Sequence, residues 1–336
     1  MAVVRCLNCM TEYEETLRGC PKCGWIRKDE RAFGMELEAG SILNSRYILG
    51  TLRGESSNDF LYIGWDALFS RNVLIQEYFP KELVSRADDG SKVKVNHEED
   101  VEVYQRGCER FEQCGQALLA LDGMQGMVNV LAIPHANGTV YQILEYPGEV
   151  TLREILEERT FWNVQQAEKL LLKLAEPLLI LHEKGIYHGQ ISVDCCYLTE
   201  DGGWQIGRFN NAQAYERKAY EKEELSEEEL TESGKNADIF ELAHLMGAVL
   251  CGLEEWETHS VDENLDLMEE HFPEYLVDAL ECALSEDPSL WPASLQDFLN
   301  QFLDEETTEL LVQEEEKIRE NVQWDRSQSI WEKLFR

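Results

Sequence analysis

The chain has 336 residues, and its 66 acidic and 30 basic residues give a formal net charge of −36. Charge of this sign repels phosphate and anionic lipid, so the composition argues against nucleic acid or a membrane as a partner. No apolar run reaches the roughly 20 residues that cross a bilayer. The first ten residues carry no secretion signal, and ten cysteines then indicate thiols and a metal site rather than disulfides. We expect a folded cytoplasmic protein.

Two Cys-x-x-Cys pairs stand near the start of the chain: Cys6 with Cys9, and Cys20 with Cys23. Two-residue spacing lets both thiols of a pair turn onto one ion, and two pairs complete a tetrahedral site of four thiolates, which favours zinc. Four thiolates leave no open coordination position, so we predict structural zinc that supplies the folding energy of this short segment. Residues 1–30 resemble a zinc ribbon, and residues 31–41 are a predicted linker.

The segment after the linker is rich in alternating and β-branched residues, which predict half-buried strands. A loop from Lys81 to Glu98, a helix near 101–121 and a further strand at 137–146 follow. The three strands that we predict before the loop are Tyr47–Gly54, Asp59–Trp65 and Asn72–Tyr78.

Helical periodicity dominates the second half of the chain. Apolar residues at i, i+3, i+4 and i+7 from Ala167 to Leu179 mark one buried helix face. Asp201-Gly202 separates two strand-like runs and predicts a hairpin. A Glu-rich loop over 213–236 precedes an apolar helix through Leu250, and a last helix is expected within 286–303.

The acidic tail, residues 304–336, is predicted to be helical. Its apolar end repeats at helical spacing and consists of Ile330, Trp331, Leu334 and Phe335. These residues either pack back on the domain, which we favour, or dock into a groove of a partner.

Several short sequences resemble the bacterial Ser/Thr protein kinase family: RYILG from Arg46, YIGWD from Tyr62 and EYFP from Glu77. The family's His-Arg-Asp and Asp-Phe-Gly triplets flank a hairpin. Here those positions read His188-Gly189-Gln190 and Arg208-Phe209-Asn210. The resemblance implies an α+β, two-lobed protein kinase-like fold, with an N-lobe at 42–147 and a C-lobe at 148–303.

The same resemblance implies where phosphoryl transfer would occur, and there the required groups are replaced. Transfer needs cationic and metal-binding groups around the phosphates and a base for the attacking hydroxyl. Each such loss costs on the order of 10²–10⁴ in rate, so we predict a pseudokinase without catalytic residues. The replacements are Gln76 for the strand Lys, Cys114 for its helix Glu, Gln190 for the base Asp, and Cys195 and Arg208 for the metal-binding Asn and Asp.

Nucleotide binding is expected to be lost as well. The glycines of the family's Gly-rich loop are mostly replaced, and Asp59 brings a carboxylate to where phosphate would lie. By the resemblance, Leu74 lies above the adenine and Tyr197 below it, beside the hinge residues Glu145 and Tyr146. We therefore predict an occluded nucleotide slot and no Mg-ATP cofactor.

The resemblance also implies which residues keep a structural role. Leu118, His188, Phe209 and Asp238 match the family's internal spine and its anchor, so His188 is interpreted as a core histidine.

Cys195 and Cys196 present a second possible chemistry, because a Cys beside a His can be a nucleophile. Adjacent cysteines on a buried strand are more often inert small hydrophobes. Strand alternation would also turn their side chains to opposite faces. We expect neither to be catalytic.

These observations predict a signalling scaffold or regulator that works by binding a protein, either a basic partner or an active kinase. Two alternatives stay open. In the first, Arg208 replaces metal charge and the chain binds or transfers a phosphorylated ligand without Mg²⁺, with Glu223 or Asp194 as base. In the second, the chain is an adaptor that binds through its zinc ribbon.

Overall fold

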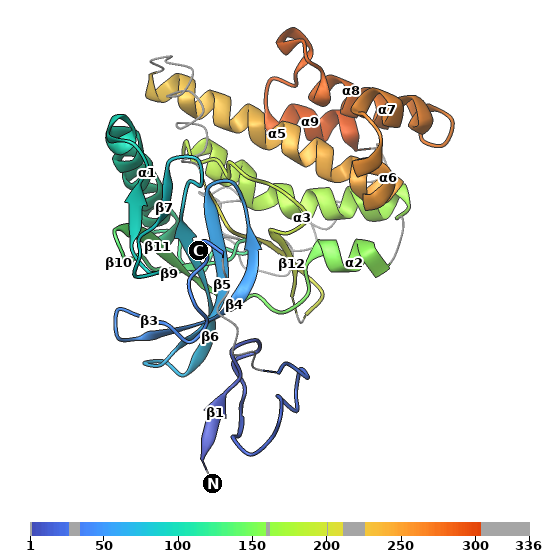
Figure 1. The fold of residues 1–336 in the computed structure, drawn as a ribbon. Coiled ribbons are helices and arrows are strands. Elements are labelled where there is room, and N and C mark those ends of the chain that lie inside the picture. Colours follow the sequence, from blue (N-terminus) through green and yellow to red (C-terminus); the bar gives the residue numbers. More distant parts are fainter. Residues whose placement is uncertain (1, 27–33, 159–161, 200, 211–225, 304–336) are drawn as a thin grey trace, which may run out of the picture. The chain divides into compact units, whose positions relative to one another are not determined.

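The computed structural model describes residues 2–26, 34–158, 162–199, 201–210 and 226–303. The chain divides into two compact units, whose elements are labelled in Figure 1. None of the helices in these ranges is long and apolar enough to cross a membrane. The first unit comprises Met1–Asp122, Val128–Tyr146 and Asn210–Glu224, and the second comprises Gly123–Met127, Pro147–Phe209 and Leu225–Arg336.

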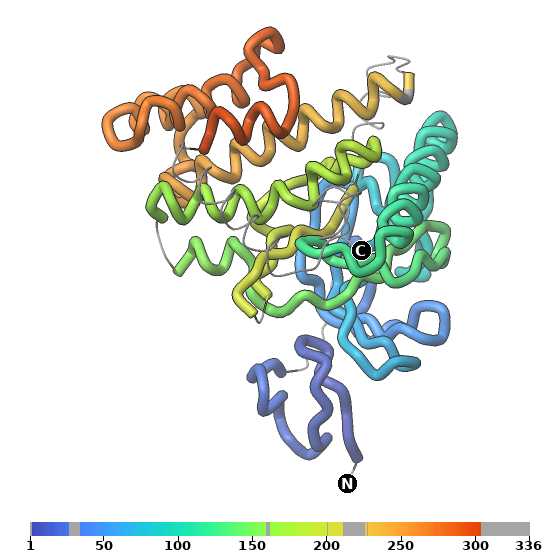
Figure 2. Tube along the Cα trace, turned by 180° about the vertical axis from the view of Figure 1, so that it is seen from behind, coloured from blue at the N-terminus to red at the C-terminus, as the bar shows by residue number. Residues whose placement is uncertain are grey.

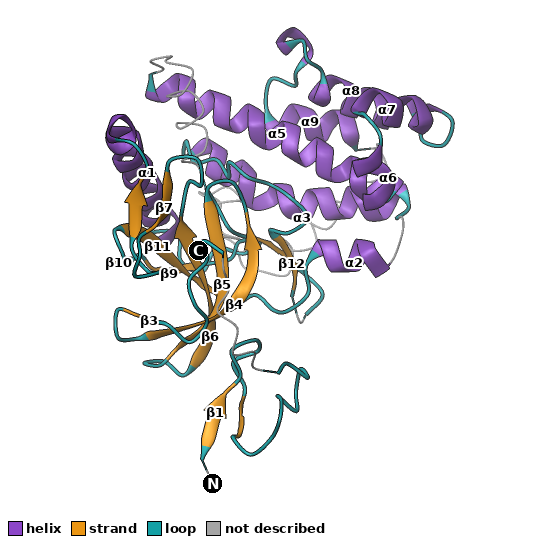
Figure 3. Ribbon diagram, viewed as in Figure 1, coloured by secondary structure: helices purple, strands orange, loops and turns teal. Residues whose placement is uncertain are grey.

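A seven-stranded antiparallel sheet forms the core of the first unit (Figure 3). The strand order is β10-β11-β6-β5-β4-β3, and β9 also pairs with β11. The three predicted strands are confirmed to within one residue. Their β-branched and aromatic side chains favour strands because they pack in the core of this unit. The strands are β3 Ile42–Leu43, β4 Tyr47–Glu55, β5 Asp59–Asp66, β6 Arg71–Tyr78, β9 Val130–Ala132, β10 His135–Ala136 and β11 Thr139–Glu145.

A helix and a small hairpin complete the sheet unit. The helix is α1 (Val101–Leu119), which follows η1 (Glu98–Asp100) and packs on β9 and β11. The predicted loop from Lys81 to Glu98 is wrong in part, because it contains the hairpin β7 (Val84–Arg86) and β8 (Val93–Val95). The Asp89 carboxylate accepts two backbone N–H bonds at the turn, and the next residue, Gly90, has φ +71°.

The Cys-rich segment belongs to the first unit. Its two short strands, β1 (Val3–Arg5) and β2 (Glu12–Glu14), pair antiparallel. The remainder of the segment as far as residue 26 consists of turns that bring the four cysteines together.

Helices dominate the second unit, and Figure 2 shows α3 and α5 running alongside each other. The predicted hairpin is confirmed as the pair β12 and β13. A Ser226–Glu229 capping box begins α5, so the expected Glu-rich loop is wrong for the residues from 227 onward. The elements are α2 Leu152–Glu158, α3 Val164–Glu183, β12 Cys196–Leu198, β13 Trp204–Ile206, α5 Glu227–Cys251, α6 Leu253–Thr258, α7 Val261–Glu269, α8 Glu274–Leu284, η2 Pro288–Leu290 and α9 Leu295–Phe302.

Some sequence-based expectations fall outside the described residues. These are the helical tail at 304–336 with its apolar end, the first part of the Glu-rich loop with Glu223, and residues 27–33 around the start of the linker.

Candidate functional site

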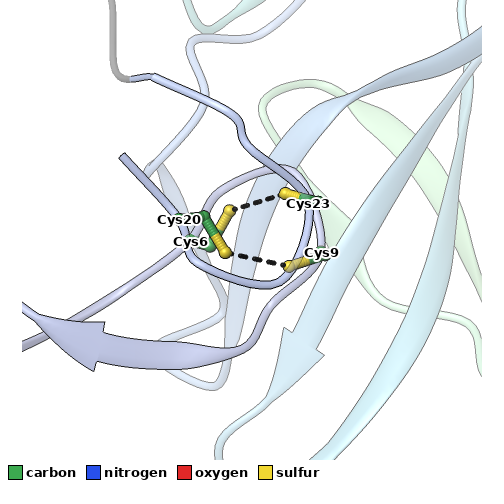
Figure 4. A group of neighbouring side chains, drawn as sticks. All are labelled: Cys6, Cys9, Cys20 and Cys23. Atoms are coloured by element: carbon green, nitrogen blue, oxygen red, sulfur yellow. Dashed lines mark hydrogen bonds between the residues drawn. The ribbon is translucent and has the colours of Figure 1, made fainter. Parts of the chain in front are cut away.

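The four cysteines of the first unit lie close enough to share one ion (Figure 4). Their Sγ atoms are all within 4.8 Å of one another, and the Cys6–Cys23 and Cys9–Cys20 pairs are each 3.6 Å apart. Tetrahedral zinc with Zn–S bonds of about 2.3 Å separates its sulfurs by about 3.8 Å, so this group fits zinc. The four thiolates would hold the metal and leave no open position, which suits a structural role.

Gln76 lies on β6 in the first unit and is fully buried. Its side-chain amide donates a 2.7 Å hydrogen bond to a carboxylate oxygen of Asp59, which is also fully buried. The register explains the contact: Gln76 lies opposite Leu61 on β5, and Asp59 is two residues along the same face. The hydroxyl of Ser56 donates to the other Asp59 oxygen at 2.6 Å. Gln76 stands where the resemblance places the family's strand Lys. It is bonded to Asp59, which is in turn bonded to Ser56.

The other predicted residues of the first unit lie on elements around Gln76. Cys114 is buried on α1, and Leu74 is buried on β6, two residues before Gln76. The predicted hinge begins at the end of β11, where the Glu145 N–H donates to the Asn129 carbonyl at 2.8 Å. Tyr146 is the next residue and the last residue of the segment Val128–Tyr146 of this unit.

In the second unit, a buried carboxylate holds the turn that contains His188. Asp238 on α5 accepts the backbone N–H groups of His188 and Gly189 at 2.7 and 2.8 Å, and it also bonds the His182 ring at 2.8 Å. Gly189 has φ +80°, a conformation that suits glycine. Asp238 therefore acts here as a structural anchor.

The His188 ring is fully buried and stacks on Phe209, with ring centroids 4.3 Å apart. Its Nε2 lies 2.8 Å from the Gly207 carbonyl, and its Nδ1 accepts the Gln190 N–H at 3.2 Å. With Nδ1 as the acceptor, Nε2 is the donor to the Gly207 carbonyl. The Cys195 side chain beside the ring raises the pKa of His188. Both ring nitrogens are occupied by the backbone, which suits a core histidine better than a general base. Leu118 lies in the first unit, so its place in the same spine stays a prediction.

The two adjacent cysteines are fully buried. Both thiols point to the Ser192 carbonyl, at 3.0 Å from Cys195 and 3.4 Å from Cys196. The expectation that they point to opposite faces is therefore wrong, because β12 begins only at Cys196 and Cys195 still belongs to the preceding turn. The bond with Cys195, together with burial, raises the pKa of the Cys196 thiol, which disfavours its thiolate. The bond with Cys196 and the neighbouring His188 ring lower the pKa of the Cys195 thiol, but Cys195 is fully buried.

The remaining predicted positions of the second unit surround the hairpin. Gln190 ends the turn that Asp238 holds, and Tyr197 lies buried on β12 opposite Gln205. Arg208 is buried with φ +64°. Burial raises the pKa of the Tyr197 hydroxyl, and the positive charge of Arg208 partly opposes that rise. Leu74 and Tyr197 lie in different units, so their joint filling of an adenine slot stays a prediction.

Sequence analysis does not single out Glu241, which lies three residues after Asp238 on α5. One of its carboxylate oxygens accepts the backbone N–H of Ile191, next to the predicted base position. The i, i+3 spacing of the two acids on one helix is the signal that would have pointed to it. Burial and the nearby Asp238 charge raise the pKa of the Glu241 carboxyl to about 7.

We expect Glu241→Gln to stabilise the chain at neutral pH. Because the folded pKa lies above the unfolded value of 4.5, the carboxyl weakens the fold progressively as pH rises from 4.5 to about 7. Gln keeps an oxygen for the Ile191 N–H and cannot ionise. Urea unfolding should show a gain of about 2 kcal/mol near pH 8 and almost none near pH 4.

Glu232→Gln is the matched control for this prediction, because Glu232 lies exposed on the same helix. It should change the free energy of unfolding by less than about 0.5 kcal/mol at either pH. A gain for Glu241→Gln that is independent of pH would contradict the assignment.

Comparison with solved structures identifies a protein of similar fold. The structure of the PpkA kinase domain titled "PpkA-294 apo form" is similar to this chain, with a TM-score of 0.61 and 22% identity. The similarity covers 80% of this chain and 100% of that one. The chain has a protein kinase fold. It is α+β, with a four-Cys metal-binding cluster added at its N-terminal end.

One curated relative carries sequence similarity. A probable serine/threonine-protein kinase of Clostridium perfringens is 26% identical over 177 residues, which are 53% of this chain and 23% of that protein. The match thus spans less than a quarter of the relative's length. No protein-family model matches the chain.

Proposed function

We propose that this chain is a catalytically inactive kinase-like protein that scaffolds or regulates a signalling partner by binding it. The observation that carries the proposal is the buried bond between Gln76 and Asp59. Phosphoryl transfer needs a cation at the first of these positions and free approach of phosphate at the second. A neutral amide bonded to a carboxylate offers neither, because the carboxylate repels phosphate.

The turn in the second unit supports the same proposal. Asp238 holds the backbone of His188 and Gly189 as a rigid turn, yet the next residue, Gln190, has no group that accepts a proton at neutral pH. Arg208 brings a positive charge to the predicted metal position, which opposes Mg²⁺. The turn that would carry the base is retained, whereas the base and the metal-binding group are replaced. This combination suits a protein selected for binding.

The partner that we propose is a protein with a basic surface. Lys235 is the sole Lys or Arg between residues 226 and 303, whereas acidic residues recur throughout that stretch. Asp266 and Leu267 on α7 and Glu270 directly after it are all exposed, which offers an apolar contact within a negative field. Capture of such a partner should weaken as salt rises, and capture that is indifferent to salt would exclude this surface.

Calorimetric titration of the metal-loaded chain with ATP tests the proposal. We expect no heat of binding and no shift in melting temperature at ATP concentrations up to about 1 mM, with or without Mg²⁺. Micromolar binding that requires Mg²⁺ would overturn the proposal. Binding that needs no metal and disappears in Arg208→Gln would favour the alternative of a phosphorylated ligand held by Arg208.

The zinc-ribbon adaptor makes a different prediction. Deletion of residues 1–30 would abolish partner capture if the ribbon is the binding module. We expect capture to persist wherever the deleted chain still folds, because the proposed binding surface lies in the second unit.

A further inference from the structure

The two halves of the four-Cys site have the same backbone geometry. The Met10 N–H donates to the Cys6 carbonyl at 2.9 Å, and the Gly24 N–H donates to the Cys20 carbonyl at 2.8 Å. This geometry puts the residue after each second cysteine in the left-handed region, with φ +58° at Met10 and φ +72° at Gly24. Glycine adopts this conformation without strain because it has no Cβ atom, whereas methionine is strained there. The first half therefore retains a strained residue where glycine would serve.

Packing against the sheet explains the methionine. Met10 is 1% exposed and lies against Gly50 of β4. A Cβ atom at Gly50 would overlap both the Met10 methyl group and the Leu7 carbonyl oxygen. At Gly24, by contrast, no atom lies within 4 Å of where a Cβ would stand. Among the described residues, the first Cys-x-x-Cys turn, residues 6–10, packs on the sheet through Met10, whereas the second turn makes no such contact at Gly24.

Hydrogen bonds join the same turn to β4. The backbone N–H of Thr51 donates to the Leu7 carbonyl at 2.8 Å, and the Thr51 hydroxyl donates to the Asn8 side-chain oxygen at 2.9 Å. Arg53 donates to the Asn8 carbonyl. The Asn8 amide also donates to the Cys23 sulfur at 3.7 Å. Asn8 thus contacts a metal ligand on one side and β4 on the other.

We propose that the four-Cys site is a metal-dependent brace of the kinase-like sheet. Bound metal fixes residues 6–10 in the conformation that covers β4, and β4 leads into the turn that ends at Asp59. Without metal, Met10 is released from its strained conformation and β4 loses its cover. Metal binding and the order of β4 are then coupled, and the coupling is reciprocal. This proposal is independent of the loss of catalysis.

Hydrogen exchange of the full-length chain tests the brace. In the unsubstituted protein, removal of zinc by a chelator should speed exchange of residues 47–55 by at least about tenfold. Met10→Gly retains all four ligands and relieves the strain, so Zn²⁺ or Co²⁺ should still bind with a four-thiolate spectrum. Its residues 47–55 should nevertheless exchange fast in both states. Exchange that is the same with and without zinc in the unsubstituted chain would overturn the proposal.

Two further variants complete the test. Gly24→Ala strains the other half of the site, which has no contact with the sheet at this position, so zinc-loaded Gly24→Ala should protect residues 47–55 normally. Thr51→Ala removes one hydroxyl outside the Cys-rich segment and touches no metal ligand. Reciprocal coupling predicts that it weakens zinc affinity about fivefold. Unchanged affinity in Thr51→Ala would refute the coupling even if Met10→Gly failed to fold.

Discussion

With radiolabelled ATP and Mg²⁺, the metal-loaded chain is expected to transfer phosphate at least about 10⁴-fold more slowly than an intact kinase domain. Gln190 cannot take the proton of an attacking hydroxyl, and Gln76 carries no charge to offset the phosphates. Loss of either group alone costs on the order of 10²–10⁴ in rate. Losses that act on one transition state do not simply multiply, so we take the upper single-group value as the expected minimum.

Restoring one group should not restore transfer. In Gln76→Lys, the new ammonium would meet the buried Asp59 carboxylate, which already receives the Gln76 amide at 2.7 Å. The pair would satisfy itself rather than bind phosphate. Gln296→Lys, at an exposed position of α9, adds the same charge elsewhere and serves as the control. Transfer by the unsubstituted chain that depends on Arg208 would contradict the inactive assignment.

Local patterns in the sequence predict much of the sheet. The strands β4, β5 and β6 follow from runs of β-branched and aromatic residues, and the β12–β13 hairpin follows from Asp201-Gly202. The β7–β8 hairpin escapes prediction because each strand has only three residues. The start of α5 escapes because a run of glutamates hides the Ser226–Glu229 capping box.

The contacts of the site depend on register, which the sequence alone does not determine. Asp59 and Gln76 are both recognisable as unusual, yet they are 17 residues apart and meet only because Leu61 faces Gln76 across the sheet. The contact of Asn8 with Thr51 spans 43 residues and depends on how the Cys-rich segment docks. Met10 looks like an ordinary apolar residue until its backbone conformation is known.

A second large effect is expected at Glu77, the neighbour of Gln76 on β6. Successive residues of a strand face opposite ways, so Glu77 lies on the other face of the sheet. Glu77 is fully buried, and its carboxylate accepts hydrogen bonds from both Nη groups of Arg86, at 2.8 and 2.5 Å. It also accepts hydrogen bonds from the hydroxyls of Tyr141 and Tyr62, at 2.7 and 3.1 Å. One face of β6 carries the neutral Gln76, while the other carries a buried ion pair.

Glu77→Ala should lower the free energy of unfolding by about 3–5 kcal/mol, because it leaves the Arg86 guanidinium buried without its counter-ion. Chemical denaturation at neutral pH measures this loss. Glu55→Ala is the matched control: it breaks a 2.7 Å ion pair with Lys81 at the surface and should cost at most about 1 kcal/mol. Similar losses from the two variants would show that burial does not govern the strength of this pair.

The double variant Glu77→Leu with Arg86→Met separates the charge from the packing. It removes both partners and fills their space with apolar groups, so no buried charge is left unpaired. It should therefore be more stable than Glu77→Ala, although the Tyr62 and Tyr141 hydroxyls lose their acceptor at a cost of about 1–3 kcal/mol each. Arg86 also donates to the carbonyl of Met35, within the predicted linker, at 2.7 Å. If the double variant is no more stable than Glu77→Ala, the network stabilises the fold through the tyrosine and linker bonds rather than through the ion pair.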